Sequence, residues 1–285
     1  MNRHNPARLP VSRKLGYGIG CIAYSLPYQI TASALLFYMT AVLDIPVLWA
    51  GAIVAASALW DAMIDPLFGY LSDNTESRRF GRRHQYLLAG GVLICLFSYY
   101  LWSIDPNASS VFKIVLLCVL VFALKTALTI FVIPYNALGG ELSTDYDERS
   151  SIQSYRALFY IIGMIVALVG SNVVFFRSTP TYPKGQLNPA AYPAMGLTFG
   201  IIALIIAVLC YFATRRYIPV LPQRSDAMKR KGLSWRHAYE DLRGALTNKD
   251  FRALTLMIFI LEAGFQLGIV IGYHVNTYTY NLTAR

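Results

Sequence analysis

Residues 60–83 read WDAMIDPLFGYLSDNTESRRFGRR, and this stretch joins an apolar run to a basic one. Its first half closes an apolar run over about 47–71, and its second half lies in a polar segment over 72–85 that carries four arginines. A run of about 20 mostly apolar residues is long enough to cross a bilayer as a helix. Lys and Arg gather beside such helices on the cytoplasmic side. The stretch therefore predicts the cytoplasmic end of a transmembrane helix.

The same pattern repeats along all 285 residues, of which 56% are hydrophobic and 14% are charged. A globular domain is roughly 45–50% apolar and about 25% charged. Seven runs reach spanning length, and in lipid each must satisfy its own backbone hydrogen bonds as a helix. We therefore predict an all-α, polytopic membrane protein with spans at about 16–43, 47–71, 86–104, 111–138, 154–177, 194–214 and 253–280.

The basic residues are distributed unevenly about these spans. Twenty of the 25 Lys and Arg residues fall in segments on one side, four fall on the other, and Lys125 lies within a span. The positive-inside rule then places the N-terminus in the cytoplasm of a plasma (inner) membrane. The net charge of +10 is explained by this topology, so we expect no nucleic-acid partner. The four cysteines lie inside apolar runs and are expected to be small buried side chains.

The spans suggest four segments. Residues 1–15 are a cytoplasmic N-terminus, 16–214 hold six spans, 215–252 form a basic cytoplasmic loop, and 253–285 hold a seventh span. A single span after a long loop has no partners of its own. We expect the full-length protein to continue with further helices.

Two carboxylates lie within the second span. Asp61 and Asp65 are four residues apart, so they share one face of the helix. A charge at mid-bilayer costs about 2.5–3.5 kcal/mol on insertion scales. Two adjacent anions resist joint ionisation unless a cation or a proton lies between them. The pair predicts a cation or proton site, and the alternative is a structural ion-pair network.

A cation lies at matching depth in the fourth span. Lys125 and Thr129 are again four residues apart, and Lys125 is as far from the start of its span as Asp61 is from the start of the second. Lys125 is expected to pair with one carboxylate, leaving one net negative charge. An internal ammonium competes with a metal cation, which favours a proton-coupled or weakly cation-coupled site. Alternatively, Lys125 only neutralises an aspartate. Glu262, in the seventh span, either lines a pathway or simply reaches water.

Three stretches together resemble one family: KLGYGIG at 14–20, the quoted 60–83, and IPYNALGGELSTDYDERSSIQSYR at 133–156. They are similar to the glycoside–pentoside–hexuronide cation symporters, the melibiose-permease-like branch of the major facilitator superfamily. The resemblance implies a twelve-helix fold of two six-helix halves with solute and coupling cation near the midplane. This chain matches the N-terminal six-helix half plus the seventh helix.

The resemblance also implies roles for particular residues. Asp61, Asp65 and Thr129 fall on cation-site positions, so H⁺ or Na⁺ is the expected coupling ion, with no other cofactor and no structural metal. Arg156 falls near the sugar pocket. A cytoplasmic gating loop, expected to pair with the other half, includes Gly69, Asp73, Arg78, Arg82 and Arg83.

The chain departs from the melibiose-permease pattern at the sugar. Ser25 and Val132 stand where that pattern has sugar-binding acids, Ile64 stands for a cation-site asparagine, and Lys125 is not expected there. The candidate substrate-binding residues are therefore Ser25, Tyr28, Arg156 and Glu262. The coupling carboxylates are kept while the galactoside-binding acids are not.

We predict a secondary transporter that carries a sugar or glycoside-type solute together with a cation or proton by alternating access. One alternative is a non-sugar solute such as a lysolipid on the same scaffold. Another is a non-transporting membrane scaffold or fragment. A membrane enzyme is the least favoured alternative and is not expected, since the sequence has no HExxH, GxSxG or phosphate-binding glycine loop. The expected partners are a small-molecule solute and the lipid bilayer.

Overall fold

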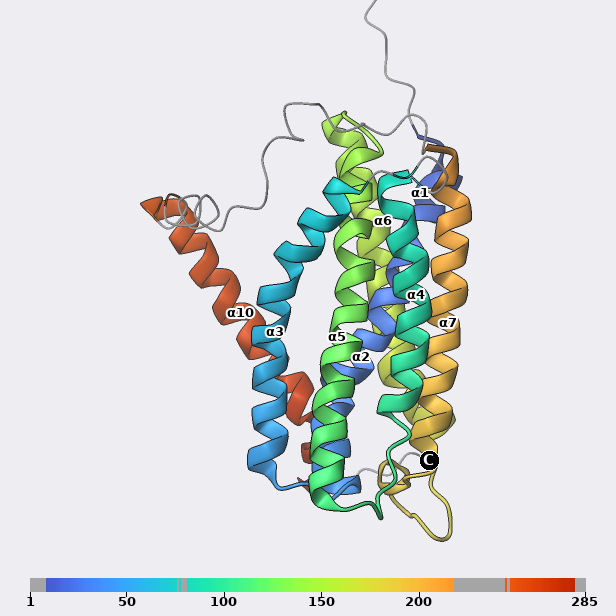
Figure 1. Ribbon diagram of the computed structural model, residues 1–285, viewed down its shortest axis with the longest axis vertical. Coiled ribbons are helices and arrows are strands. Elements are labelled where there is room, and N and C mark those ends of the chain that lie inside the picture. The colour runs from blue at the N-terminus through green and yellow to red at the C-terminus, as the bar shows by residue number, and fades with distance from the viewer. Residues whose placement is uncertain (1–8, 76, 78–80, 218–243, 245–246, 280–285) are drawn as a thin grey trace, which may run out of the picture.

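The computed structural model describes residues 9–75, 77, 81–217, 244 and 247–279, which form a bundle of long helices (Figure 1). Among these residues, seven helical segments are long and apolar enough to cross a membrane, which confirms the predicted number of spans. The α-helices are α1 (Val11–Gly18), α2 (Gly20–Phe37), α3 (Val47–Asn74), α4 (Gly81–Leu101), α5 (Ser110–Glu141), α6 (Tyr146–Ile165), α7 (Ala191–Thr214) and α10 (Lys249–His274).

Short π-helical and 3₁₀ segments extend or flank several of these helices. The first, fifth and seventh spans end in π-helical turns, and 3₁₀ turns lie beside α7. They are η1 (Tyr38–Val42), η2 (Val166–Phe175), η3 (Gly185–Leu187), η4 (Arg215–Tyr217) and η5 (Val275–Thr279).

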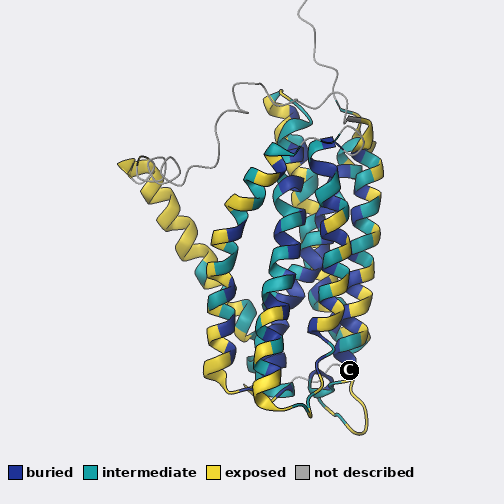
Figure 2. Cartoon of the chain, viewed as in Figure 1, coloured by how far each residue is buried: buried dark blue, intermediate teal, exposed yellow. Residues whose placement is uncertain are grey.

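The helix α2 lies inside the bundle. It packs against α6, α7 and α10, and its side chains Leu26, Ile30 and Phe37 are fully buried. By contrast, α10 is exposed along most of its length (Figure 2). Without competing water in the bilayer, helices associate by close packing rather than by the hydrophobic effect. The centre of the bundle is therefore built around α2.

Small residues bring α4 and α7 together. Gly196 and Gly200 form a GxxxG pattern on α7, and a Cβ on Gly200 would lie 2.9 Å from the Cα of Cys95. A Cβ on Gly196 would lie 2.7 Å from the carbonyl oxygen of Ser98. Such glycines let helix backbones approach closely, which is the usual route to stable packing in lipid.

A further glycine on α4 gives a stability prediction. A Cβ on Gly90 would lie 2.8 Å from the backbone nitrogen of Phe131 on α5. We expect Gly90→Ala to destabilise the protein by about 1–3 kcal/mol, because backbone atoms cannot yield to overpacking. Gly51→Ala is the matched control, since nothing lies within 4 Å of its new Cβ. Thermal unfolding in detergent measures both, and equal midpoints would contradict the prediction.

The helices extend beyond the apolar runs at the basic end of the bundle. Arg82 and Arg83 lie in α4, and Arg149 lies in α6. The polar segment predicted at 72–85 and the gap predicted between the spans at 111–138 and 154–177 were therefore too long. The polar start of α6 is stabilised by Asp145, whose side chain accepts a hydrogen bond from Glu148 N at 2.9 Å. Hydropathy detects only the apolar, membrane-spanning part of a helix. The predicted loop at 215–252 lies largely outside the described residues.

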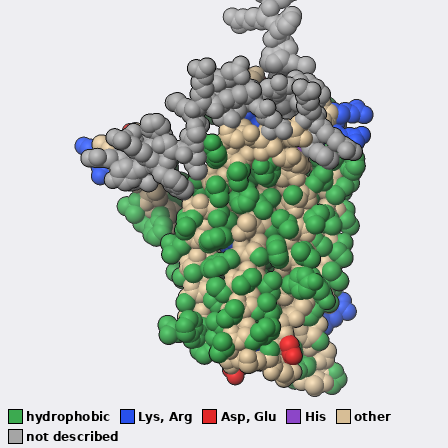
Figure 3. Space-filling model, viewed as in Figure 1, with side chains coloured by type: hydrophobic (Ala, Val, Ile, Leu, Met, Phe, Trp, Pro, Cys, Tyr) green, Lys and Arg blue, Asp and Glu red, His purple; other side chains and the backbone are tan. Residues whose placement is uncertain are grey.

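The surface matches a bilayer environment. Hydrophobic side chains cover the flank seen in Figure 3, while the coloured charged groups lie mainly toward its ends. Large apolar side chains are exposed among the described residues, including Leu48 at 81% and Ile260 at 61%. A continuous apolar surface is unfavourable in water but normal against lipid.

Candidate ion and solute site

Two carboxylates on α3 face two polar groups on α5. Asp61 and Asp65 are one helical turn apart on α3, and Lys125 and Thr129 are one turn apart on α5. Lys125 Nζ forms an ion pair with Asp61 Oδ2 at 2.6 Å. Thr129 Oγ1 donates a hydrogen bond to Asp65 Oδ1 at 2.8 Å. The two helices run in the same direction (Figure 1), so the two contacts follow one another along them. In each contact the two partners are 64 residues apart in the chain.

Two cavities meet at this cluster. The larger, of about 320 Å³, lies between α2, α3, α5 and α10 and is lined by Tyr28, Thr31, Ala32, Leu35, Leu36, Val54, Ser57, Ala58, Asp61, Lys125, Leu128, Gln266 and Val270. The smaller, of about 50 Å³, is lined by Tyr24, Tyr28, Asp61, Asp65, Lys125, Leu128, Thr129 and Val132. Asp61, Lys125, Tyr28 and Leu128 line both. Small-molecule sites are concave and mostly apolar with a few placed polar groups.

The charges at the cluster do not cancel. Two carboxylates face one ammonium, and among the described residues Asp65 forms no ion pair. The side chain of Lys125 is 17% exposed and that of Asp61 is 30% exposed. A net negative charge in a partly desolvated site favours uptake of one further positive charge. The geometry therefore agrees with a site for a proton or a monovalent cation.

Aromatic and amide groups from α2 and α10 complete the wall. Lys125 Nζ lies 5.3 Å from the ring centroid of Tyr28, a cation–π distance. The Tyr28 ring stacks on Tyr24 at 5.1 Å, and its hydroxyl accepts a hydrogen bond from Gln266 Nε2 at 3.5 Å. Tyr28 was predicted from the sequence, whereas Tyr24 and Gln266 were not. A glutamine inside an apolar span was the available signal for Gln266.

The other predicted substrate residues lie outside both cavities. Ser25 is fully buried against α6. It lies so close to Gly163 that a Cβ added to this glycine would be 2.0 Å from the Ser25 Oγ. Arg156 donates a hydrogen bond to Asn136 on α5. Glu262 is exposed on α10 and forms no hydrogen bond or ion pair with the described residues. Their roles in solute binding stay predictions.

The comparison with known proteins decides the family. Residues 16–282 match the MFS/sugar transport protein family. The chain belongs to this family. The match covers all but the first five residues of the described spans and includes both cavities. It places this MFS chain among transport proteins rather than enzymes. The resemblance to symporters of the major facilitator superfamily is thereby confirmed.

The curated relatives are named as symporters. An uncharacterized symporter of Synechocystis is 31% identical over 71% of this chain and 36% of its own length. The inner membrane symporter YicJ of Escherichia coli is 25% identical over 94% of this chain and 54% of its own length. The sodium-dependent lysophosphatidylcholine symporter 1-B of Danio rerio is 32% identical over 61% of this chain and 33% of its own length. The chain thus spans between a third and just over half of these relatives.

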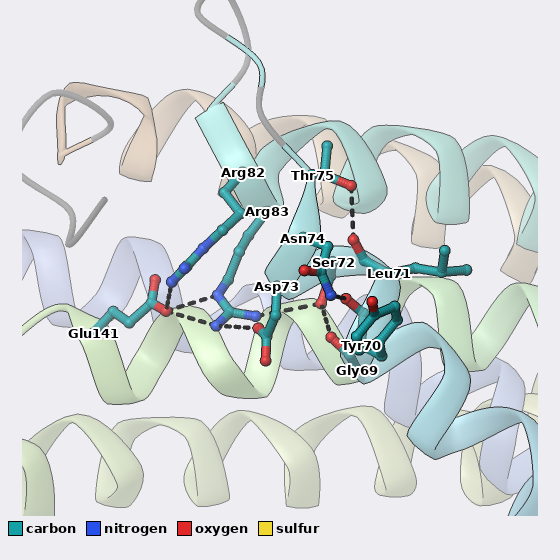
Figure 4. A network of polar contacts seen from close by, with 10 residues as sticks. All are labelled: Gly69, Tyr70, Leu71, Ser72, Asp73, Asn74, Thr75, Arg82, Arg83 and Glu141. Carbon is teal, nitrogen blue, oxygen red and sulfur yellow. Dashed lines mark hydrogen bonds and ion pairs between the residues drawn. The ribbon is translucent and has the colours of Figure 1, made fainter. Parts of the chain in front are cut away.

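The basic end of this MFS chain carries a charged network (Figure 4). Glu141, at the end of α5, accepts hydrogen bonds from Arg82 and Arg83 of α4. Arg83 also pairs with Asp73 at 2.8 Å and donates to Ser72 Oγ at 3.3 Å. Ser72 Oγ in turn donates to the carbonyl of Gly69 at 3.0 Å.

Four predicted gating-loop residues therefore meet at one place, namely Gly69, Asp73, Arg82 and Arg83, while Arg78 lies outside the described residues. The sequence interpretation expected partners from the other half, but Glu141 provides one within this half. Glu141 was not predicted as a site residue, although it lies in the stretch quoted for the resemblance. Its acidic side chain at the end of an apolar span was the available signal.

Proposed function

We propose that this protein is a secondary transporter that carries a sugar or glycoside-type solute together with a proton or cation. The observation that carries the proposal is the cluster of Asp61, Asp65, Lys125 and Thr129, which lines two adjoining cavities inside the bundle. Intramembrane ionisable groups beside a cavity usually mark an ion or substrate pathway. The three relatives described above are named as symporters, which supports ion coupling.

Lys125 bears on the choice of coupling ion. Its ammonium already lies 2.6 Å from Asp61, where a metal cation would otherwise bind. The remaining negative charge lies at Asp65, whose one polar partner among the described residues is the Thr129 hydroxyl. A proton neutralises such a group without needing further oxygen ligands, whereas Na⁺ needs several. We therefore favour H⁺ over Na⁺ as the coupling ion.

The arrangement of α10 supports alternating access. At the end away from the basic network, the Tyr273 hydroxyl lies 3.1 Å from Ser171 Oγ, and Lys184 Nζ donates to the Thr277 carbonyl at 2.6 Å. Toward the basic end, α10 diverges from the bundle (Figure 1) and its residues 249–262 are exposed. Rocking of helices about a central site is the common mode of such transporters. The apolar, exposed face of α10 is where further helices of the full-length protein would pack.

The charge distribution supports a multi-pass protein of the plasma (inner) membrane with its N-terminus in the cytoplasm. The basic network of Arg82 and Arg83 lies at the same end as the start of α1 (Figure 1). Cytoplasmic loops are the ones enriched in Lys and Arg. Reporter fusions at residue 1 and at the 102–109 loop would test the orientation.

A second candidate solute is a lysolipid. Most residues lining the larger cavity are apolar, and one relative is named a sodium-dependent lysophosphatidylcholine symporter. A competition assay separates the two candidates. If glycosides do not inhibit uptake of the transported solute but lysolipids do, the sugar proposal is wrong.

Uptake by the full-length protein in liposomes tests the proposal as a whole. Radiolabelled glycosides are offered with an imposed proton gradient, an imposed Na⁺ gradient, or neither. We expect accumulation with the proton gradient and its collapse when a protonophore is added. Equal uptake with and without every gradient would contradict ion coupling.

A further inference from the structure

Lys125 is the one basic residue that lines either cavity in the described part of the chain. Its ammonium contacts Asp61 at 2.6 Å and lies 5.3 Å from the Tyr28 ring centroid. Asp61 is also the one acidic residue lining the larger cavity. The charged pair therefore forms the polar end of a space whose remaining walls are mostly apolar.

This position makes Lys125 reachable by a solute. A side chain that is 17% exposed and lines the wall of a cavity is not sealed behind other groups. Where water is largely excluded, an ammonium attracts an anion much more strongly than in bulk water. A neutral solute gains little from that charge, whereas an anionic group gains the full ion-pair contact.

A second anion would compete with Asp61 for the same ammonium. If a solute carboxylate takes Lys125, Asp61 loses its partner one turn from Asp65. An uncompensated charge of this kind is strongly unfavourable in a partly buried site. The Asp61–Asp65 pair then gains affinity for a proton, which two adjacent carboxylates share. By linkage, proton binding raises the affinity for the anionic solute by the same factor.

We propose that Lys125 binds the anionic group of the solute, and that its exchange of partner from Asp61 to the solute couples solute binding to proton uptake. This inference rests on the symport function proposed above and adds to it the class of solute, an organic anion. It also gives Lys125 a role beyond neutralising an aspartate. No covalent step is involved, since one ion pair replaces another and the Asp61–Asp65 pair gains the proton.

Two probes that differ at one group test the solute class. Methyl β-D-glucuronide and methyl β-D-glucoside share a ring and differ in carrying a carboxylate or a hydroxymethyl group. With the full-length protein in detergent, we expect the glucuronide to bind at least about tenfold more tightly, the scale of one charge-assisted contact. Its binding should be accompanied by proton uptake from a weakly buffered solution.

Variants of Lys125 then assign the preference to this residue. We expect Lys125→Gln to abolish the preference and the proton uptake, and Lys125→Arg to retain a preference. Lys249→Gln is the matched control, because Lys249 is exposed at the start of α10 and lines neither cavity. Size-exclusion profiles of all three variants report whether they fold. If Lys125→Gln does not fold, Asp61→Asn is measured instead. An Asp61→Asn protein that has lost the preference for the glucuronide but still takes up a proton would overturn the exchange.

The outcomes separate this inference from the symport proposal. Binding of neither probe, or equal binding of both, overturns the anion assignment. Gradient-driven uptake of the glucoside that survives Lys125→Gln also overturns it but leaves the symport proposal standing. Tight glucuronide binding that depends on Lys125 without any gradient-driven uptake supports the anion site and overturns symport.

Discussion

Replacing Asp65 with asparagine is expected to lower accumulation of the solute against its gradient about 10- to 100-fold. Asp65 carries the negative charge that Lys125 leaves uncompensated, and it is held by the Thr129 hydroxyl at 2.8 Å. Asparagine keeps the shape and a hydrogen-bond acceptor, but it is neutral, so it cannot take up a proton and offers a cation no charge. A charged hydrogen bond contributes about 1.5–3 kcal/mol, so gradient-driven uptake should fall about 10- to 100-fold.

The measurement is uptake by the full-length protein in liposomes with and without an imposed proton gradient. Solute exchange at equal concentrations, which needs no net ion movement, should persist in Asp65→Asn. Asp44→Asn is the matched control, because Asp44 is exposed in a loop and its positive φ of 53° suits asparagine. If Asp65→Asn accumulates solute as well as Asp44→Asn does, the coupling role of Asp65 is wrong.

Replacing Glu141 with glutamine is expected to give the largest loss of stability. The Glu141 side chain is 15% exposed and faces two guanidinium groups, those of Arg82 and Arg83. Without the charge of Glu141, Asp73 is the one carboxylate of the network left beside the two guanidinium groups, and its side chain is 57% exposed. Breaking a buried pair costs about 3–5 kcal/mol, and we expect about 3 kcal/mol here because the network lies at the end of the bundle.

Thermal unfolding in detergent checks this expectation. Asp147→Asn is the control, since Asp147 is an exposed acid at the same end, in the first turn of α6. It should cost no more than about 1 kcal/mol through the helix dipole. High salt should narrow the gap between the two variants only slightly, because partly buried charges are weakly screened. Equal unfolding midpoints would show that the network does not stabilise the bundle.

The fold class followed directly from local patterns in the sequence. Apolar runs long enough to cross a bilayer admit one regular backbone, so the number of spans was predicted correctly. The helix ends were not, because a helix continues into polar sequence when a cap such as Asp145 satisfies its first amide groups. Hydropathy carries no information about such extensions.

Part of the candidate site also followed from the sequence. A spacing of four residues places Asp61 and Asp65 on one helix face, and equal depth in two spans pairs Lys125 with one carboxylate. The structure contains this ion pair and adds the contact between Thr129 and Asp65. Ser25 shows the limit of the approach, since its helix is rotated so that it meets Gly163 rather than a cavity.

The sequence alone determined which segments lie in the membrane, which side holds most of the positive charge, and which buried charges need partners. These properties depend on local composition and on the helical repeat. Only the tertiary structure decided that Glu141 joins Arg83 across 58 residues and that Gln266 of α10 reaches Tyr28 of α2. Such contacts depend on how each helix is rotated and tilted against its neighbours. That geometry is set by the packing of the whole bundle, including its glycines, and not by any single stretch of chain.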